Sequence, residues 1–299
     1  MTALATTREE RPVYFEAGDE QLFGIITEPT TEPNGIGVIL VSGGAVPATC
    51  RNRLWVRIAR RAAARGYHSL RFDFHGVGES TGVVDQYRLD RPFPNDVLAC
   101  VRCLQEHGVD EFVLVGECFG ARSAMAAVAQ IPGLRGVIAL AAPPIDGEMG
   151  TQRIQETPMS TYARRTFRLR TVRELFKSSR RRDFVRIARA KIQGMTSERG
   201  TVVGAAQGVS PLYAGPMAEL SANGIPVLLA FGTEDREYRF FCEERDELAH
   251  ILEAPGAKFD EHLLPGEIHG LSRLSVQDAV AELIDTWLAS RVDPGTDGP

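Results

Sequence analysis

The fold is decided by one short stretch, Glu111-Phe112-Val113-Leu114-Val115-Gly116-Glu117-Cys118-Phe119-Gly120. Its apolar first half is typical of a strand that is buried on both faces. An alanine-rich segment to Gln130 follows and is typical of a helix. Between the two lies the pattern G-x-C-x-G, and a sharp turn from strand to helix leaves no room for a Cβ on either side of its central residue. We therefore predict that Cys118 is raised above the edge of a sheet, where a helix begins.

A cysteine at this position has two interpretations. The dipole and the free N–H groups of the helix favour a thiolate at Cys118, which is the nucleophilic form. In that case the N–H of Phe119 points toward the oxyanion that develops on a substrate. Alternatively, Cys118 is a small apolar residue buried after a strand, as free cysteines often are. The motif alone does not separate the two, and the remaining chain has to decide.

Strands and helices alternate along most of the chain. After a hairpin in 12–27, strands are predicted over 36–41, 68–74, 111–115, 136–140, 225–231 and 259–264, and helices over 52–65, 94–107, 239–252 and 276–291. This alternation predicts an α/β fold with a mostly parallel sheet flanked by helices. The pattern breaks over 147–222, which we interpret as a helical cap inserted into a core of 12–146 and 223–292. Residues 1–11 and 293–299 are expected to be flexible tails.

Two further residues follow the later strands and complete a catalytic pattern. Asp235 ends the run Phe231-Gly232-Thr233-Glu234-Asp235, and His269 lies in Gly266-Glu267-Ile268-His269-Gly270 after the last strand. The carboxyl ends of parallel strands meet at one edge of a sheet, so nucleophile, acid and base are expected to meet there. Their order in the chain is the one this motif predicts. We therefore predict a triad of Cys118, Asp235 and His269, with Glu234 as the alternative acid.

The second oxyanion N–H is expected from the loop after strand 36–41. Ala45 is the first candidate and Gly44 the second, although Gly43-Gly44 is also consistent with a tight turn alone. Glu117, next to the nucleophile, is either a buried structural acid or a modulator that raises the pKa of Cys118 until substrate displaces it.

Composition excludes several other classes of protein. A net charge of −5 over 299 residues gives no general attraction to nucleic acid or to anionic membranes. The chain holds no apolar run of the ~20 residues that cross a bilayer. Five cysteines without a secretory signal indicate a reducing cytoplasm, and Cys100 and Cys103 have no second pair with which to form a zinc site. We expect no cofactor and no metal. The sequence is silent on the oligomeric state.

A basic amphipathic stretch lies within the expected cap. Twelve arginines and lysines fall between Arg164 and Lys191, interleaved with apolar residues. It is interpreted either as a lid helix with a solvated basic side or as a docking face for an acidic acyl carrier protein.

The motifs together resemble those of the α/β-hydrolase superfamily, over about residues 12 to 292. The segment Arg71-Phe72-Asp73-Phe74-His75-Gly76-Val77-Gly78-Glu79-Ser80 is similar to the superfamily's D-x-R-G-x-G-x-S, with His75 in place of arginine. The resemblance implies that His75 lies in a scaffold loop, and an approach of His75, Arg51 or Arg53 to the pocket is the alternative. Most relatives have serine where this chain has Cys118.

The cysteine at position 118 indicates which members of the superfamily this chain resembles most. A Cys-His-Asp triad is similar to that of dienelactone hydrolases, which are typically shorter and lack a comparable insertion. Residues 43–55 with G-x-C look closer to hydrolases associated with exosortase systems and polyketide pathways. This implies an ester or thioester substrate, with hydrolysis or acyl transfer through an acyl-thioenzyme. Elimination of a carboxylate such as acetate from a tetronate-type intermediate is an alternative outcome. A ligand-binding pseudo-hydrolase is the non-enzymatic alternative, and it predicts a missing triad residue.

Overall fold

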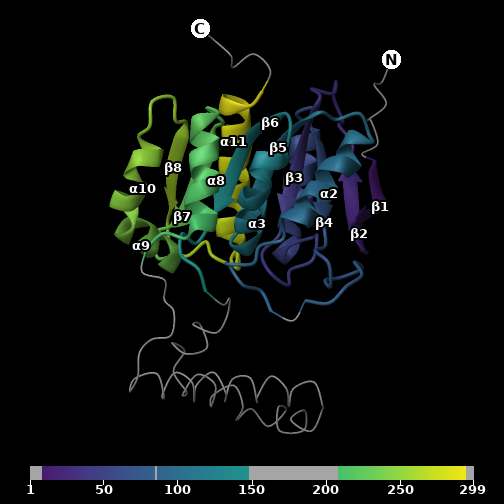
Figure 1. The fold of residues 1–299 in the computed structure, drawn as a ribbon. Helices are drawn as coiled ribbons and strands as arrows, with labels where there is room; N and C mark the ends of the chain where they lie inside the picture. Colours follow the sequence, from purple (N-terminus) through teal and green to yellow (C-terminus); the bar gives the residue numbers. More distant parts are fainter. Residues whose placement is uncertain (1–8, 85, 148–207, 294–299) are drawn as a thin grey trace, which may run out of the picture. The chain divides into compact units, whose positions relative to one another are not determined.

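The computed structural model describes residues 9–84, 86–147 and 208–293, and an eight-stranded sheet lies at its centre (Figure 1). The strand order is β1-β2-β4-β3-β5-β6-β7-β8. The strands are β1 Glu10–Ala17, β2 Glu20–Thr27, β3 Ile36–Val41, β4 His68–Phe72, β5 Glu111–Glu117, β6 Leu134–Leu140, β7 Val227–Gly232 and β8 Phe259–Leu264. Only the pairs β1–β2 and β2–β4 are antiparallel. The predicted α/β fold with a mostly parallel sheet is confirmed.

The central strands are apolar because helices cover both faces of the sheet. Every residue of β3 and of β7 is buried. Figure 1 shows α2 (Pro94–Gln105), α3 (Phe119–Ala127) and α8 (Pro211–Ala222) together on one face. Residues of α1 (Leu54–Ala63) and α11 (Leu274–Arg291) share a separate core with alternate residues of β3, β5 and β7. This layering makes the carboxyl ends of the parallel strands the one edge at which loops can build a site.

The second compact unit of the chain ends earlier than the insertion expected over 147–222. The chain divides into a unit of residues 1–146 and 208–299 and a second unit of 147–207, so α8 belongs with the sheet. Its N-cap Ser210 is held by Arg122, which also binds the carbonyl of Pro143 at 2.9 Å. No sequence pattern indicates this, because a helix that covers a sheet and one that covers a pocket share the same periodicity. The basic stretch of the expected cap lies outside the described residues.

Smaller differences have local causes. β1 begins at Glu10 rather than at residue 12, because the Glu10 carboxylate binds Arg71 at 3.1 Å and also Arg60. The single helix expected over 239–252 is two helices, α9 (Arg236–Glu243) and α10 (Arg245–Leu252). Asp293, expected in a tail, accepts a hydrogen bond from Tyr67. In the part of the chain that the structure describes, no helix is both long enough and apolar enough to cross a membrane.

Candidate active site

Cys118 occupies the turn between β5 and α3 and is almost fully buried. Its φ of 51° and ψ of −113° are rare for a residue with a side chain. Such a conformation costs on the order of 1–3 kcal/mol. The two flanking glycines are sterically required, as predicted. A Cβ on Gly116 would lie 2.5 Å from Ala121 Cα, and one on Gly120 would lie 2.3 Å from the carbonyl oxygen of Ser42. The strain and the two close approaches hold the thiol in one direction.

His269 meets Cys118 from the loop after β8. The two side chains are hydrogen-bonded, and the ligand atoms of Cys118, His269 and Glu117 all lie within 4.8 Å of one another. On the other side of the ring, His269 Nδ1 lies 2.7 Å from Oε1 of Glu237. A thiol, an imidazole and a carboxylate therefore form one chain of interactions.

The acid in this chain is not the one expected from the sequence. Asp235 Oδ1 accepts the backbone N–H groups of Ile268 and His269 at 2.9 and 3.0 Å, and its Oδ2 accepts that of Gly232 at 2.7 Å. Asp235 thus fixes the loop that carries His269, whereas Glu237 contacts the ring. The alternative acid, Glu234, is exposed. In the structure it is therefore Glu237, and not the expected Asp235, that contacts the imidazole.

The physical reason is the reach of the two side chains. Asp235 is the N-cap residue of α9, and its short side chain accepts hydrogen bonds from backbone N–H groups of the loop that carries His269. Glu237 lies two residues further on, in the first turn of α9, and has one more methylene. The sequence signal, an acid after β7, is satisfied by Glu234, Asp235 and Glu237 alike, and only the path of the backbone distinguishes them.

The charges of the site favour an imidazolium. Burial alone would lower the pKa of His269, but hydrogen bonds to Cys118 and Glu237, with their charges, raise it to about 11. Burial would raise the pKa of Glu237, yet the hydrogen bond and charge of His269 lower it. Burial raises the pKa of the Cys118 thiol; His269 opposes this rise, and the charges of Glu117 and Glu237 add to it. The helix terminus was expected to favour a thiolate, but desolvation outweighs it.

Glu117 joins the loops on either side of the nucleophile. Its buried Oε1 accepts the N–H of Gly270 at 3.0 Å, and its carboxylate also accepts the N–H of Gly43. A Cβ on Gly43 would lie 2.2 Å from Glu117 Oε2, so the carboxylate fills the space that a side chain would need. Burial raises the pKa of Glu117, and the charge of His269 opposes that rise. Glu117 is thus a buried acid that holds two loops together, and its charge also raises the pKa of Cys118. The contacts are compatible with a structural role and with a modulating role.

The three expected oxyanion residues, Phe119, Ala45 and Gly44, all contact one side chain, that of Tyr87. Phe119 is the first residue of α3, where backbone N–H groups have no carbonyl partner within the helix. Ala45 has a φ of 57°, and its N–H donates to the hydroxyl of Tyr87. The Tyr87 ring lies over Gly44 and 5.2 Å from the ring of Phe119. Tyr87 is a residue that the sequence analysis missed, because no motif marks the loop that carries it.

Among the remaining candidates, Arg51 interacts with this cluster through its charge, which opposes the rise in the pKa of Glu117. His75 Nδ1 pairs with Asp96 at 2.9 Å and packs on Phe93, which agrees with a scaffold role. Arg51 and Arg53 are exposed. Within residues 9–84, 86–147 and 208–293, the only cluster with metal-ligating side chains is Glu117, Cys118 and His269 itself. Such a set is of the kind that zinc accepts, but each member already has its partner in the interactions described above.

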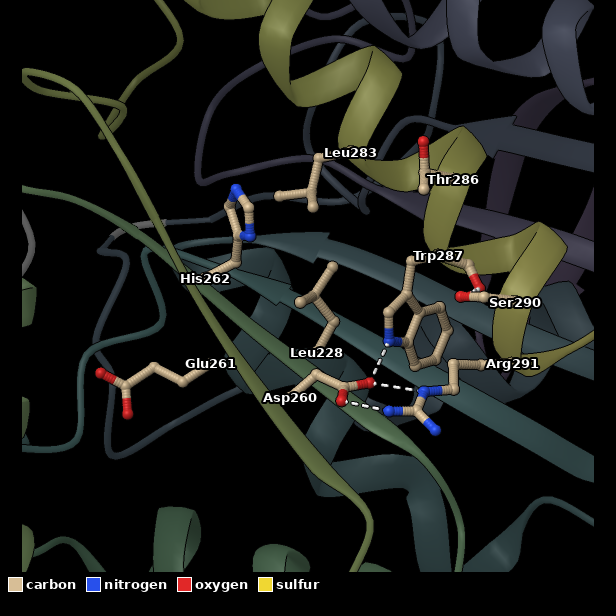
Figure 2. A pocket seen from close by; sticks show the side chains of 9 residues that line it. All are labelled: Leu228, Asp260, Glu261, His262, Leu283, Thr286, Trp287, Ser290 and Arg291. Atoms are coloured by element: carbon tan, nitrogen blue, oxygen red, sulfur yellow. Dashed lines mark hydrogen bonds and ion pairs between the residues drawn. The ribbon is translucent and has the colours of Figure 1, made fainter.

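A pocket of about 280 Å³ lies away from this site, between β8 and α11 (Figure 2). In its wall, Asp260 accepts hydrogen bonds from Trp287 Nε1 at 2.8 Å and from Arg291. These contacts attach the last helix to the edge strand of the sheet. None of the lining residues belongs to the cluster around Cys118.

Comparisons with known proteins agree with the fold. Residues 38–283 match the model of the alpha/beta hydrolase family, so the chain belongs to this family. Its expected assignment to the hydrolase class of enzymes agrees with that membership. A search of curated proteins finds no match.

Solved structures of several enzymes share the fold. They include an esterase of Pyrococcus furiosus (14% identity, TM-score 0.61, covering 96% of this chain and 92% of that one). A proline iminopeptidase of Mycobacterium smegmatis is similar at 17% identity and a TM-score of 0.56, covering 94% and 98%. A thioesterase domain from the curacin biosynthetic pathway is similar at 17% identity and a TM-score of 0.54, covering 93% and 99%.

Proposed function

We propose that this protein cleaves an ester or thioester with Cys118 as covalent nucleophile, His269 as general acid and base, and Glu237 as the acid that orients His269. The observation that carries the proposal is the continuous chain from the Cys118 thiol through the imidazole to Glu237 Oε1. A buried, strained cysteine at the beginning of a helix, with a histidine held on its far side by a carboxylate, has the roles of a catalytic triad.

The reaction follows from these positions. The proton of the Cys118 thiol passes to His269, and the resulting thiolate attacks the carbonyl carbon. The carbonyl π electrons move to the oxygen, where the N–H of Phe119 donates a hydrogen bond. The intermediate collapses, the bond to the leaving alcohol or thiol breaks, and the His269 imidazolium protonates the leaving group. Glu237 keeps Nδ1 protonated and offsets the ring's charge throughout. Water, deprotonated by the then neutral His269, attacks the acyl-thioenzyme and releases a carboxylic acid.

The substrate class rests on chemistry and on the fold. An acyl-thioenzyme is itself an activated acyl donor, so an alcohol or amine in place of water gives acyl transfer. An esterase and a thioesterase domain are among the proteins of similar fold, which supports an ester or thioester substrate. As part of the proposal, the basic stretch 164–191 receives an acyl carrier protein, because its arginines complement an acidic partner.

The test is intact mass spectrometry after brief incubation with p-nitrophenyl acetate. The protein should carry Cys242→Ala, because Cys242 is an exposed free cysteine and would react on its own. We expect one acetyl group on this protein and none on the double variant that also carries Cys118→Ala. His269→Ala should slow acylation by at least about 100-fold. Turnover without any adduct, and with full activity in the Cys118→Ala variant, would contradict the covalent role of Cys118, since His269 would then activate water directly.

A further inference from the structure

Tyr87 contacts every residue expected to build the oxyanion hole. Its hydroxyl accepts the N–H of Ala45, and its ring meets the ring of Phe119 at 5.2 Å in an edge-on arrangement. A Cβ on Gly44 would lie 2.8 Å from two carbons of the Tyr87 ring. A single side chain, far from the loop after β3 in sequence, therefore connects that loop to Phe119.

The glycine at 44 has its explanation in this contact. Gly44 does not have a positive φ, so its backbone conformation does not require glycine. What requires it is the ring of Tyr87, which leaves no room for a side chain. The absence of a side chain at Gly44 thus leaves space for the Tyr87 ring to pack against this loop. In the same way, the absence of a side chain at Gly43 leaves space for the Glu117 carboxylate.

The hydrogen bonds of the loop after β3 indicate the role of the Tyr87 hydroxyl. The Ala45 N–H, our first candidate for the second oxyanion donor, is already given to the Tyr87 oxygen. A phenol that accepts one hydrogen bond still has its own O–H to donate. We infer that the Tyr87 hydroxyl, fixed by Ala45, supplies the second hydrogen bond to the oxyanion that forms when Cys118 attacks a carbonyl. This inference rests on the proposed function and deepens it.

The surroundings of Tyr87 suit this role. Burial raises the pKa of Tyr87, and the charge of Asp96 adds to the rise, whereas the Ala45 hydrogen bond opposes it, so the phenol keeps its proton at neutral pH. The centroid of the Phe93 ring lies 5.9 Å from that of Tyr87 and 4.9 Å from that of Phe119, so the three aromatic rings pack against one another. A donor that is positioned before the reaction does not need to reorganise during it.

The experiment compares Tyr87→Phe with the parent protein, both carrying Cys242→Ala. The substitution removes the hydroxyl and keeps the ring over Gly44. For p-nitrophenyl acetate we expect kcat to fall by about 100-fold, as on loss of one oxyanion donor, with KM changed by less than about 3-fold. Alkylation of Cys118 by iodoacetamide should proceed at the parent rate, because that reaction develops no oxyanion. A kcat that is unchanged or raised would overturn the inference, since Tyr87 would then only pack or obstruct the hole.

A second measurement uses the unaltered protein and does not require turnover. Trifluoroacetophenone adds to a thiolate to give a tetrahedral oxyanion that mimics the intermediate. In a crystal structure of this adduct, the oxygen should lie within hydrogen-bonding distance of both Tyr87 Oη and Phe119 N. An oxygen bound to other donors would overturn the role of Tyr87 and leave the proposed function intact. Failure of Cys118 to acylate in the parent protein would instead contradict the proposed function itself.

Discussion

Glu237 and Asp235 have similar chemistry and different positions, and this makes them separable by mutation. Glu237→Gln keeps the shape but removes the charge beside Nδ1 of His269. We expect kcat/KM for p-nitrophenyl acetate to fall by roughly 10³–10⁴-fold, by analogy with amide replacement of a triad acid. The melting temperature should change little.

Asp235→Asn is the matched control for that variant. The Asp235 carboxylate accepts three backbone N–H groups, and an amide has only one oxygen to offer them. The loss of buried acceptors should destabilise the fold by about 1–3 kcal/mol, measured by urea denaturation. If Asp235→Asn abolished activity in a fully stable protein while Glu237→Gln did not, Asp235 would be the catalytic acid after all.

The thiol of Cys118 should titrate above the ordinary range for cysteine. A thiolate exists above the thiol pKa, so the rate of iodoacetamide alkylation of Cys118 should rise with pH at higher values than that of an exposed thiol. A free cysteine derivative alkylated under the same conditions is the reference, and the protein carries Cys242→Ala so that this exposed thiol does not contribute.

Glu117→Gln tests the modulating role of that acid. The negative charge of Glu117 raises the pKa of Cys118, so removing the charge should shift the alkylation curve toward lower pH. The glutamine side chain would retain an acceptor for one of the two N–H groups that Glu117 binds. An unchanged curve would leave Glu117 with its structural role only.

At the scale of elements, the loop after β3 and the turn into α3 form one unit through Glu117. Gly43→Ala would place a Cβ against the carboxylate, at 2.2 Å in the present geometry. We expect a loss of about 1–3 kcal/mol in the free energy of unfolding, because overpacking forces the neighbours to move. Activity should fall with it, since the same carboxylate holds the N–H of Gly270, next to His269.

Gly215→Ala provides the comparison for a glycine without such a neighbour. It lies inside α8, and an added Cβ meets nothing within 4 Å. Because alanine favours helix, the substitution should stabilise the protein by about 0.5–1 kcal/mol and leave turnover unchanged. Equal destabilisation by the two variants would contradict the steric account of Gly43.

At the scale of the whole molecule, the basic stretch makes one separable prediction. Reversal of Arg180, Arg181 and Arg182 to glutamate should abolish turnover of acyl groups carried by an acyl carrier protein, because an acidic carrier would then be repelled. Turnover of p-nitrophenyl acetate by the same variant should stay near the parent rate. Equal losses with both substrates would discard docking at this stretch.

The sequence by itself determined the sheet, the sharp turn at Cys118 and the meeting of Cys118 with His269. These features follow from local patterns, namely apolar runs, flanking glycines and the order of strands whose ends share one edge. The tertiary structure alone decided that Glu237 rather than Asp235 contacts the imidazole, that α8 belongs to the core, and that Tyr87 packs against the loop after β3. Each of these depends on how far a side chain reaches across segments distant in sequence. The same holds for the raised pKa of Cys118, because burial is a property of the packed molecule and no short motif encodes it.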